Sequence, residues 1–265
     1  MKLHSAPTIK AAPVSQHQRV VVVTGGSRGV GRATCIKAAA LGFAVVVNYR
    51  SNTAAAASVV RQIQSTGGRA KAVRADISSE ASVRRLFKTA ERAFGPVSAL
   101  VNNAGAVEKR CEGKDIDSAR FDRAIATNLR GAFLCTREAA RAMHGTPQRR
   151  KNAGAIVNVS SYSVETGGAF NHVDYAAAKA GVEALTVGFA RELAGAGIRV
   201  NAVAPGTVDT DLSAGLVGRV RSKIEKRIPM GRFGTADEVA DCIIWLLSPT
   251  SSYVTGTIVA VNGGR

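Results

Sequence analysis

The stretch VVVVTGGSRGVG at residues 20–31 joins a β-branched run to a glycine-rich turn, and an alanine-rich helical segment follows. Glycines in such a turn let backbone N–H groups and the helix N-terminus approach a pyrophosphate. A P-loop would continue with Lys and then Ser or Thr, but Arg32 and Ala33 follow the last glycine. The stretch argues against hydrolysis of nucleoside triphosphates. It predicts a dinucleotide-binding turn formed by Gly25, Ser27, Arg28, Gly29, Val30 and Gly31.

From this turn outward, short β-branched runs alternate with longer alanine-rich stretches. The runs are continuously apolar, as is typical of strands covered on both faces. They lie at residues 20–23, 44–47, 70–74, 97–101, 156–159, 198–203 and 257–261. The helical stretches lie at residues 29–42, 52–66, 79–94, 118–144, 172–195 and 235–248. This alternation predicts an α/β fold: a single Rossmann-type doubly wound parallel sheet with helices on both faces.

The composition is that of a chain with a substantial core. Of 265 residues, 46% are hydrophobic and 21% are charged, and no break in composition divides residues 19–265. We therefore expect one domain over 19–265. Residues 1–18 are polar with two prolines, and we expect them to form a flexible tail.

Several sequence features bear on the compartment. No apolar run approaches the roughly 20 residues that span a bilayer, and residues 1–18 lack the apolar stretch of a signal peptide. The four cysteines are scattered and fit neither a metal motif nor a disulfide framework. These features predict a soluble cytoplasmic protein with reduced thiols and no membrane partner.

The charge is strongly basic and unevenly placed. The net charge is +17, and residues 1–75 hold eleven Lys or Arg with no Asp or Glu. These basic residues are interleaved with apolar runs and lack aromatic stacking platforms, which argues against nucleic acid as a partner. Two later clusters, residues 149–151 and 219–227, look like solvated faces. The pattern favours a small polyanionic ligand.

The end of the second strand indicates which dinucleotide binds. An NAD-specific Rossmann site uses Asp or Glu there to hold the adenosine ribose, but this chain has Asn48, Tyr49, Arg50 and Ser51. Arg50, together with Arg28, could clamp a 2′-phosphate through charge-assisted hydrogen bonds. The alternative is a pair of exposed arginines. We expect NADP(H) as the cofactor, with Asn48, Tyr49, Arg50 and Ser51 among the residues that bind it.

A tyrosine and a lysine stand four residues apart, at Tyr175 and Lys179, and therefore on one helical face. A nearby ammonium stabilises the phenolate and lowers a pKa that is about 10 when unperturbed. A fall to about 7 needs about 4 kcal/mol, which Lys179 and an oxidised nicotinamide acting together could supply. Asp174, just before the tyrosine, is expected to cap this helix.

Taken in order, these elements resemble the short-chain dehydrogenase/reductase family over essentially residues 19–265. The marks are TGGSRGVG at 24–31, Asp76, Asn-Asn-Ala-Gly at 102–105, Asn128, Ser160-Ser161, the Tyr175/Lys179 pair and Pro205-Gly206. The stretch from residue 228 to 264 also looks like members described as glucose dehydrogenase-like or as 3-oxoacyl-carrier-protein reductases.

The resemblance implies four catalytic residues. Tyr175 would be the general acid in carbonyl reduction and the base in alcohol oxidation. Lys179 would hold the nicotinamide ribose and lower the pKa of Tyr175. Asn128 would anchor a water relay to Lys179. Ser161 would hydrogen-bond the substrate oxygen; Ser160 competes with it, but Ser161 matches the family spacing of fourteen residues to the tyrosine.

The resemblance also implies cofactor contacts beyond the glycine turn. Asp76 would meet the adenine amine, Asn103 the adenosine ribose, and Val208 with Thr210 the carboxamide. The remaining cofactor-binding positions implied in this way are Ile77, Ala104, Gly105, Tyr175, Lys179, Pro205 and Gly206.

The sequence therefore predicts an NADP(H)-dependent oxidoreductase that interconverts a carbonyl and a secondary alcohol on a small substrate, a sugar or a ketone. The cofactor carries the hydride, so no metal is needed. One alternative is a 3-oxoacyl-carrier-protein reductase. In such reductases a docking arginine commonly follows the catalytic helix, where this chain has Ala196, although residues 149–151 could replace a second docking charge. Two alternatives from other classes are a non-catalytic NADP(H)-binding regulator and a basic interaction protein.

The helices expected at 118–144 and 172–195 resemble those through which family members form dimers and tetramers. Small residues on them would allow close packing across a two-fold axis, namely Ala139, Ala140, Ala180 and Ala184. We expect a homo-oligomer.

Overall fold

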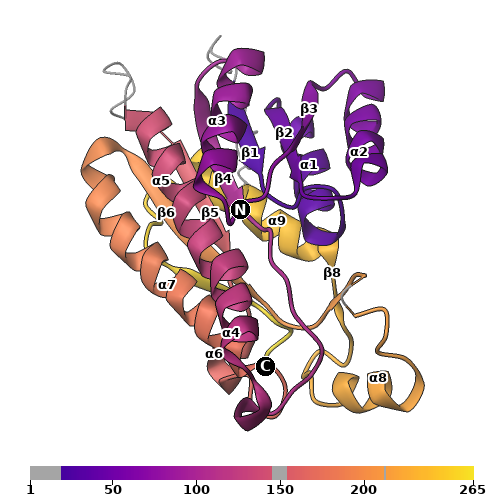
Figure 1. The fold of residues 1–265 in the computed structure, drawn as a ribbon. Coiled ribbons are helices and arrows are strands. Elements are labelled where there is room, and N and C mark those ends of the chain that lie inside the picture. The colour runs from indigo at the N-terminus through magenta and orange to yellow at the C-terminus, as the bar shows by residue number, and fades with distance from the viewer. Residues whose placement is uncertain (1–18, 145–153, 212) are drawn as a thin grey trace, which may run out of the picture.

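The computed structural model of the chain describes residues 19–144, 154–211 and 213–265 (Figure 1). The predicted tail at residues 1–18 and the basic cluster at 149–151 lie outside the described residues.

Within the described residues, seven parallel strands form the central sheet, in the order β3-β2-β1-β4-β5-β6-β9. The strands are β1 (Val20–Val23), β2 (Ala44–Tyr49), β3 (Ala70–Arg74), β4 (Val97–Asn102), β5 (Gly154–Val159), β6 (Ile198–Pro205) and β9 (Ile258–Val261). The prediction of a doubly wound parallel sheet is confirmed. The strand order reverses between β1 and β4, and ligands of such sheets bind beyond the carboxyl ends of the strands at this point.

Helices cover both faces of the sheet (Figure 1). On one face lie α1 (Gly29–Ala40), α2 (Thr53–Ser65) and α9 (Ala236–Leu247); on the other lie α3 (Glu80–Phe94), α5 (Gly131–His144) and α7 (Val173–Leu193). Successive residues of a strand point to opposite faces, so Val21 and Val23 pack toward α1 and α9, whereas Val20 and Val22 pack toward α3 and α5. Both faces are therefore apolar, which explains the continuous hydrophobic runs.

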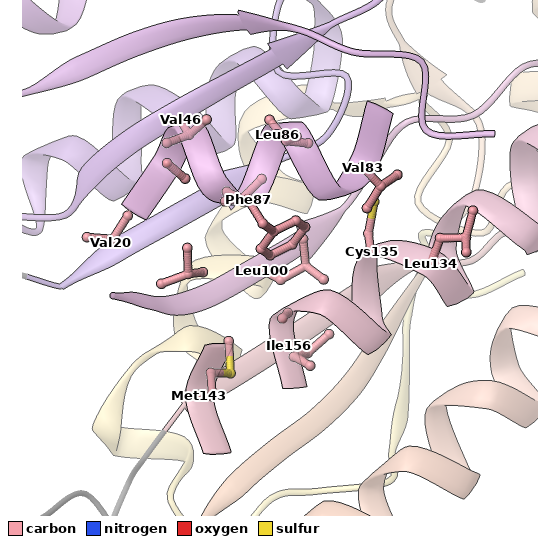
Figure 2. Close-up of a cluster of buried hydrophobic side chains, with 14 of the residues drawn as sticks. Val20, Val46, Val83, Leu86, Phe87, Leu100, Leu134, Cys135, Met143 and Ile156 are labelled. Carbon is pink, nitrogen blue, oxygen red and sulfur yellow. The ribbon is translucent and has the colours of Figure 1, made fainter. Parts of the chain in front are cut away.

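The cluster between the sheet and α3 shows how sequence spacing becomes packing. Val83, Leu86, Phe87 and Ala90 recur at helical spacing and are all buried, and Figure 2 shows Phe87 beside Leu100 of β4. The helix begins at a cap in which the side chain of Ser79 accepts a hydrogen bond from the N–H of Ser82. It ends at a glycine, residue 95, with φ of 89°.

Two buried asparagines, Asn102 and Asn158, form a row of hydrogen bonds across the same core, which we call the amide thread. The Nδ2 of Asn102 donates to the Oδ1 of Asn158 at 2.9 Å, and the Nδ2 of Asn158 donates to the hydroxyl of Thr186 at 2.8 Å. Asn102 also donates to the hydroxyl of Thr136 at 2.9 Å. The thread therefore links β4 and β5 to α5 and α7 by polar contacts inside an apolar layer.

The helix expected at residues 118–144 is divided. It consists of α4 (Ser118–Ile125), a π-helical turn η2 (Ala126–Arg130) and α5. Within the π turn, the Nδ2 of Asn128 donates to the carbonyl of Ala124 at 3.0 Å. That carbonyl is the acceptor a regular α-helix would use for the backbone N–H of residue 128, so the side chain competes for it and the turn widens.

Several short elements were not predicted. Between β6 and α9 lie β7 (Val208–Asp209), α8 (Gly218–Glu225) and β8 (Gly234–Thr235), and β7 pairs with β8. The others are α6 (Ser163–Thr166) and the 3₁₀ turns η1 (Gly113–Asp115) and η5 (Pro249–Ser251), whereas η4 (Ala194–Ala196) continues the helix predicted at residues 172–195. α8 carries the predicted basic face at residues 219–227 and has no fully buried residue, so no hydrophobic pattern marked it. None of the helices in the described part of the chain has the length and hydropathy that a bilayer crossing requires.

Candidate active site

A cleft of about 670 Å³ opens at the carboxyl ends of the sheet strands. Its wall comes from the segments that follow β1, β2, β3 and β4, from the ends of β5 and β6, and from α7. All predicted site residues line this cleft except Gly31 and Asn128, which lie behind the wall. The cleft therefore lies where a doubly wound sheet binds its ligand, and its volume is within the usual range for small-molecule sites.

Thr24 holds the glycine turn in place, a role that the sequence motif does not predict. The buried hydroxyl of Thr24 accepts hydrogen bonds from the backbone N–H groups of Asn103 and Ala104, both at 3.0 Å. In return, the Nδ2 of Asn103 donates to the carbonyls of Thr24 at 3.0 Å and Gly25 at 3.2 Å. The turn after β1 and the loop after β4 therefore form one hydrogen-bonded unit. Its place in the motif could have drawn attention to Thr24.

Two glycines make this unit possible. Gly25 has φ of 61°, a left-handed conformation that side chains rarely adopt, and its backbone approaches Ala104 closely. A Cβ at Gly31 would clash with the carbonyl oxygen of Gly25. Gly31 therefore acts by letting the first turn of α1 pack under the loop, leaving backbone N–H groups near the cleft, as a pyrophosphate requires.

The side-chain amide of Asn48 lines the cleft but is already hydrogen-bonded to the backbone. Its Nδ2 donates to the carbonyls of Val73 and Ala75, at 3.3 and 3.1 Å, and its Oδ1 accepts from the N–H of Gly25 at 3.3 Å. It thereby ties the glycine turn to β2 and β3. The neighbouring Arg50 is exposed at the rim.

The charges at this end of the cleft are exposed. Arg28 pairs with Asp211 at 3.4 Å, with side chains 61% and 69% exposed, so a phosphate could displace the carboxylate at little cost. Burial would raise the pKa of Asp76, but two hydrogen bonds from Ser78 and the charge of Arg50 hold it below its usual value. Arg50 is thus close enough to act on groups inside the cleft.

Tyr175 and Lys179 lie on the first two turns of α7, and both line the cleft. The Nζ of Lys179 donates to the carbonyl of Val159 at 2.7 Å and lies 5.6 Å from the centre of the Tyr175 ring. Burial lowers the pKa of Lys179 to about 8. Burial also raises the pKa of Tyr175 to about 12, and a hydrogen bond with Ser161 opposes this rise. The chain alone therefore holds the phenol protonated, whereas the sequence led us to expect a lowered pKa from Lys179 and an oxidised nicotinamide together.

The two serines after β5 have different partners. The hydroxyl of Ser160 is buried and donates to the Oε1 of Glu183 at 2.6 Å. Ser161 lines the cleft beside Tyr175, where its hydroxyl opposes the rise in the pKa of the phenol, and it lies 3.2 Å from the hydroxyl of Ser163. The geometry therefore favours Ser161, as the spacing of fourteen residues predicts.

Asn128 holds the loop after β4 against the end of α4 through its side-chain amide. Its Oδ1 accepts from the N–H of Ala106 at 3.0 Å, and its Nδ2 donates to the carbonyls of Ala106 at 2.9 Å and Ala124 at 3.0 Å. Its side chain is only 1% exposed and is fully used by backbone groups. A role in a water relay stays a prediction.

Some residues of the cleft were not among the predicted site residues. They are Asn52, Ala75, Ala106, Val107, Thr127, Val159, Thr207, Asp211, Ser213 and Leu216. Ala106 and Val107 directly follow the Asn-Asn-Ala-Gly loop and could have been included on that ground. Ser213 and Leu216 belong to the segment after β7, where no pattern in the sequence indicates which side chains turn inward.

Comparison with known proteins gives matches over most of the chain. The family model described as Enoyl-(Acyl carrier protein) reductase matches residues 25–265. The chain is 44% identical over 248 residues to the uncharacterized oxidoreductase YgfF of Escherichia coli (strain K12), covering 93% of this chain and 99% of the relative. It is 43% identical over 247 residues to a cis-4-hydroxycyclohexanecarboxylate dehydrogenase of Sinomonas cyclohexanicum, covering 93% and 96%. It is 37% identical over 244 residues to the 3-oxoacyl-[acyl-carrier-protein] reductase FabG of Staphylococcus aureus, covering 92% and 96%.

Proposed function

This chain belongs to the short-chain dehydrogenase/reductase family, and we propose that it is an NADP(H)-dependent oxidoreductase that interconverts a carbonyl and a secondary alcohol on a small substrate. One observation carries the proposal: Tyr175, Lys179 and Ser161 meet in a cleft that also carries Arg28 and Arg50. No carboxylate stands at the end of β2, where a site selective for NAD would have one.

The chemistry follows from the side chains. NADP(H), when bound, supplies or accepts the hydride. In the reducing direction, the hydroxyl of Tyr175 would give its proton to the substrate oxygen, while Ser161 donates a hydrogen bond to the same oxygen. The ammonium of Lys179 would stabilise the resulting phenolate. Because burial lowers the pKa of Lys179 to about 8, the lysine could also return a proton to Tyr175 near neutral pH.

The missed cleft residues Ala106, Val107 and Leu216 are small or apolar, which fits a compact, partly apolar substrate. The relative from Sinomonas cyclohexanicum is named for a hydroxylated six-membered ring. Ala196 lies in η4, directly after α7, where a carrier-protein reductase would carry a docking arginine. These observations favour a small free substrate over a carrier-bound acyl chain, and among small substrates they favour a cyclic ketone over a sugar.

Reduction of a 3-oxoacyl carrier protein is the second candidate. The net charge of +17 would speed the encounter with an acidic carrier, and the Staphylococcus aureus relative is named for this activity.

A substrate panel tests the proposal, with NADPH absorbance as the readout. The compounds are 4-oxocyclohexanecarboxylate, glucose, an aromatic ketone, and acetoacetyl groups on a short thiol and on carrier protein. We expect the highest kcat/KM with a free ketone or sugar. A preference for the carrier of about a hundredfold, about 2.7 kcal/mol, would transfer the proposal to the second candidate. Tight NADPH binding with no turnover of any compound would instead favour a regulator.

We also propose a homo-oligomer, dimer or tetramer, working in the reducing cytoplasm. Ala180 and Ala184 of α7 are exposed, as is Phe133 of α5, and these could pack against a second copy. Ala139 is fully buried inside the protomer, so the expectation that it lies at the contact is wrong. All four cysteines are free thiols, which fits a reducing compartment. A light-scattering mass of 27.5 kDa would contradict the oligomer.

A further inference from the structure

The most buried ion pair among the described residues lies outside the cleft. The Nε of Arg120, in α4, donates to the Oδ2 of Asp174, in the first turn of α7, at 2.8 Å. The two side chains are 11% and 3% exposed. The carboxylate is therefore held one residue before Tyr175 by a cation from a different helix.

Asp174 places a negative charge in the first turn of α7, whose N-cap residue supplies no side-chain acceptor. The N-cap residue of α7, His172, makes no side-chain hydrogen bond to the helix, so the first N–H groups need another acceptor. Burial would raise the pKa of Asp174, but the hydrogen bond from Arg120 and the N–H groups of the first turn hold it below its usual value. An ionised carboxylate at a helix N-terminus stabilises the first turn. The expected capping residue thus lies inside the helix and depends on Arg120.

The pair is not explained by stability alone. Buried ion pairs often contribute little net stability, because removing both charges from water offsets their attraction. Around this pair, the Nη2 of Arg120, the Oδ1 of Asp174 and the Nδ1 of His172 are buried without a partner among the described residues. A cluster optimised for stability would leave fewer such atoms.

The other charged groups nearby are already accounted for. Arg123, one turn further along α4, forms a two-point pair with Glu108 at 2.8 and 3.2 Å. Arg110 and Cys111 come from the same loop as Glu108 and act only at longer range on His172 and Arg120. Arg120 is therefore the cation that holds Asp174.

We propose that Arg120 and Asp174 are positioning residues for Tyr175, an inference that rests on the proposed function in which Tyr175 transfers the proton. Lys179 is held separately by the carbonyl of Val159, one turn along the helix. Loss of the Arg120 contact would fray the first turn and separate Tyr175 from Lys179 and Ser161 without disturbing the cofactor end of the cleft.

The test compares Arg120→Met with Arg120→Lys and with a control, Arg84→Met, which removes an exposed pair with Glu80 on α3. Hydrogen exchange of the amides of residues 176–179, in the full chain without ligand, reports fraying. In Arg120→Met we expect exchange there at least about tenfold faster, and kcat on the best panel compound reduced at least about tenfold. The Kd for NADPH should stay within about twofold, because the expected contacts of the adenosine end, at Arg28 and Arg50, are untouched. Arg120→Lys should recover most of the loss, and Arg84→Met should match the wild type.

Three results would overturn the inference: unchanged exchange in Arg120→Met, faster exchange with unchanged kcat, or an equal loss of NADPH affinity. If Arg120→Met does not fold, Asp174→Asn takes its place, because it keeps the shape and removes the charge. If no panel compound is turned over, the proposed function fails on its own, and the exchange measurement still decides whether Arg120 holds the first turn.

Discussion

At the end of the cleft near β1 to β3 the charged side chains are exposed, whereas at the α7 end they are buried. Arg28 is 61% exposed and Arg50 stands at the rim, but Lys179 is 3% exposed. Exposed charges are screened by salt and are worth little to stability, so they are suited to selecting between ligands. Buried charges interact strongly and cost folding free energy, so they are suited to chemistry that needs a fixed proton. Under the proposed function, the exposed end of the cleft would select the cofactor and the buried end would carry out the proton transfer.

The largest effect should come from the buried end. Tyr175→Phe removes the proton donor but keeps the ring, so kcat should fall by roughly a thousandfold, about 4 kcal/mol in barrier, while NADPH affinity stays within about twofold. Steady-state kinetics and a binding titration measure the two quantities. Tyr253→Phe, at a fully exposed tyrosine, is the control. Retention of more than about a tenth of kcat would remove Tyr175 from this role.

The second effect is a dependence of stability on pH. Burial lowers the pKa of Lys179 from 10.5 to about 8, so below pH 8 the folded protein holds a charge that costs stability. Between pH 8 and 10.5 the unfolded chain binds more protons than the folded one, so stability gained from this group rises with pH. Relative to Lys179→Met, the wild type should gain on the order of 3 kcal/mol in unfolding free energy across this window. Denaturant titrations of both proteins at several pH values measure it; parallel curves would show that Lys179 is not buried as a cation.

The third effect belongs to the exposed end. Arg50→Asp should lower kcat/KM for NADPH roughly 10- to 100-fold and leave that for NADH equal or higher, because one charge-assisted contact is lost. The wild-type preference for NADPH should also shrink as salt is raised. Arg61→Asp, at an exposed arginine of α2 outside the cleft, controls for the change in net charge. Equal wild-type kcat/KM values for the two cofactors would contradict the assignment.

The smallest effect concerns the segment between β7 and β8. Arg221 forms an exposed pair with Asp209 at 3.0 Å and a half-buried pair with Glu225 at 2.9 Å, and it lies over the ring of Phe233. Arg221→Ala should raise the KM for substrate by roughly two- to fivefold and change the unfolding free energy by less than about 1 kcal/mol. A loss of kcat/KM above about tenfold would mean that this segment, although exposed, contributes to the chemistry.

The sequence predicted the interior better than the surface. Strands such as β1 and β2 were located because both faces of the sheet are covered, which leaves a continuous apolar run. α8 was not located because an exposed helix has no apolar stripe to reveal it.

In the cleft, the residue types were predicted but their partners were not. Asn48 and Asn103 were assigned to the cofactor, yet their amides bond to neighbouring backbone. The π turn at Asn128 was missed because it depends on one side chain taking the carbonyl of Ala124. Such competition between side chain and backbone depends on local geometry, and spacing along a sequence does not carry it.

The amide thread through the core has a consequence for how the chain folds. Asn102 lies directly opposite Asn158 in the β4–β5 register, and the same two side chains reach hydroxyls on α5 and α7. Valines precede both asparagines, so a slip of one residue would place an amide against an aliphatic side chain and leave donors unpaired, at about 1–3 kcal/mol for each. A pair of valines would pack about equally well after such a shift, because neither side chain needs a hydrogen-bond partner. A pair of amides would lose its hydrogen bonds. The thread therefore favours the native alignment of β4 with β5 over one shifted by a single residue.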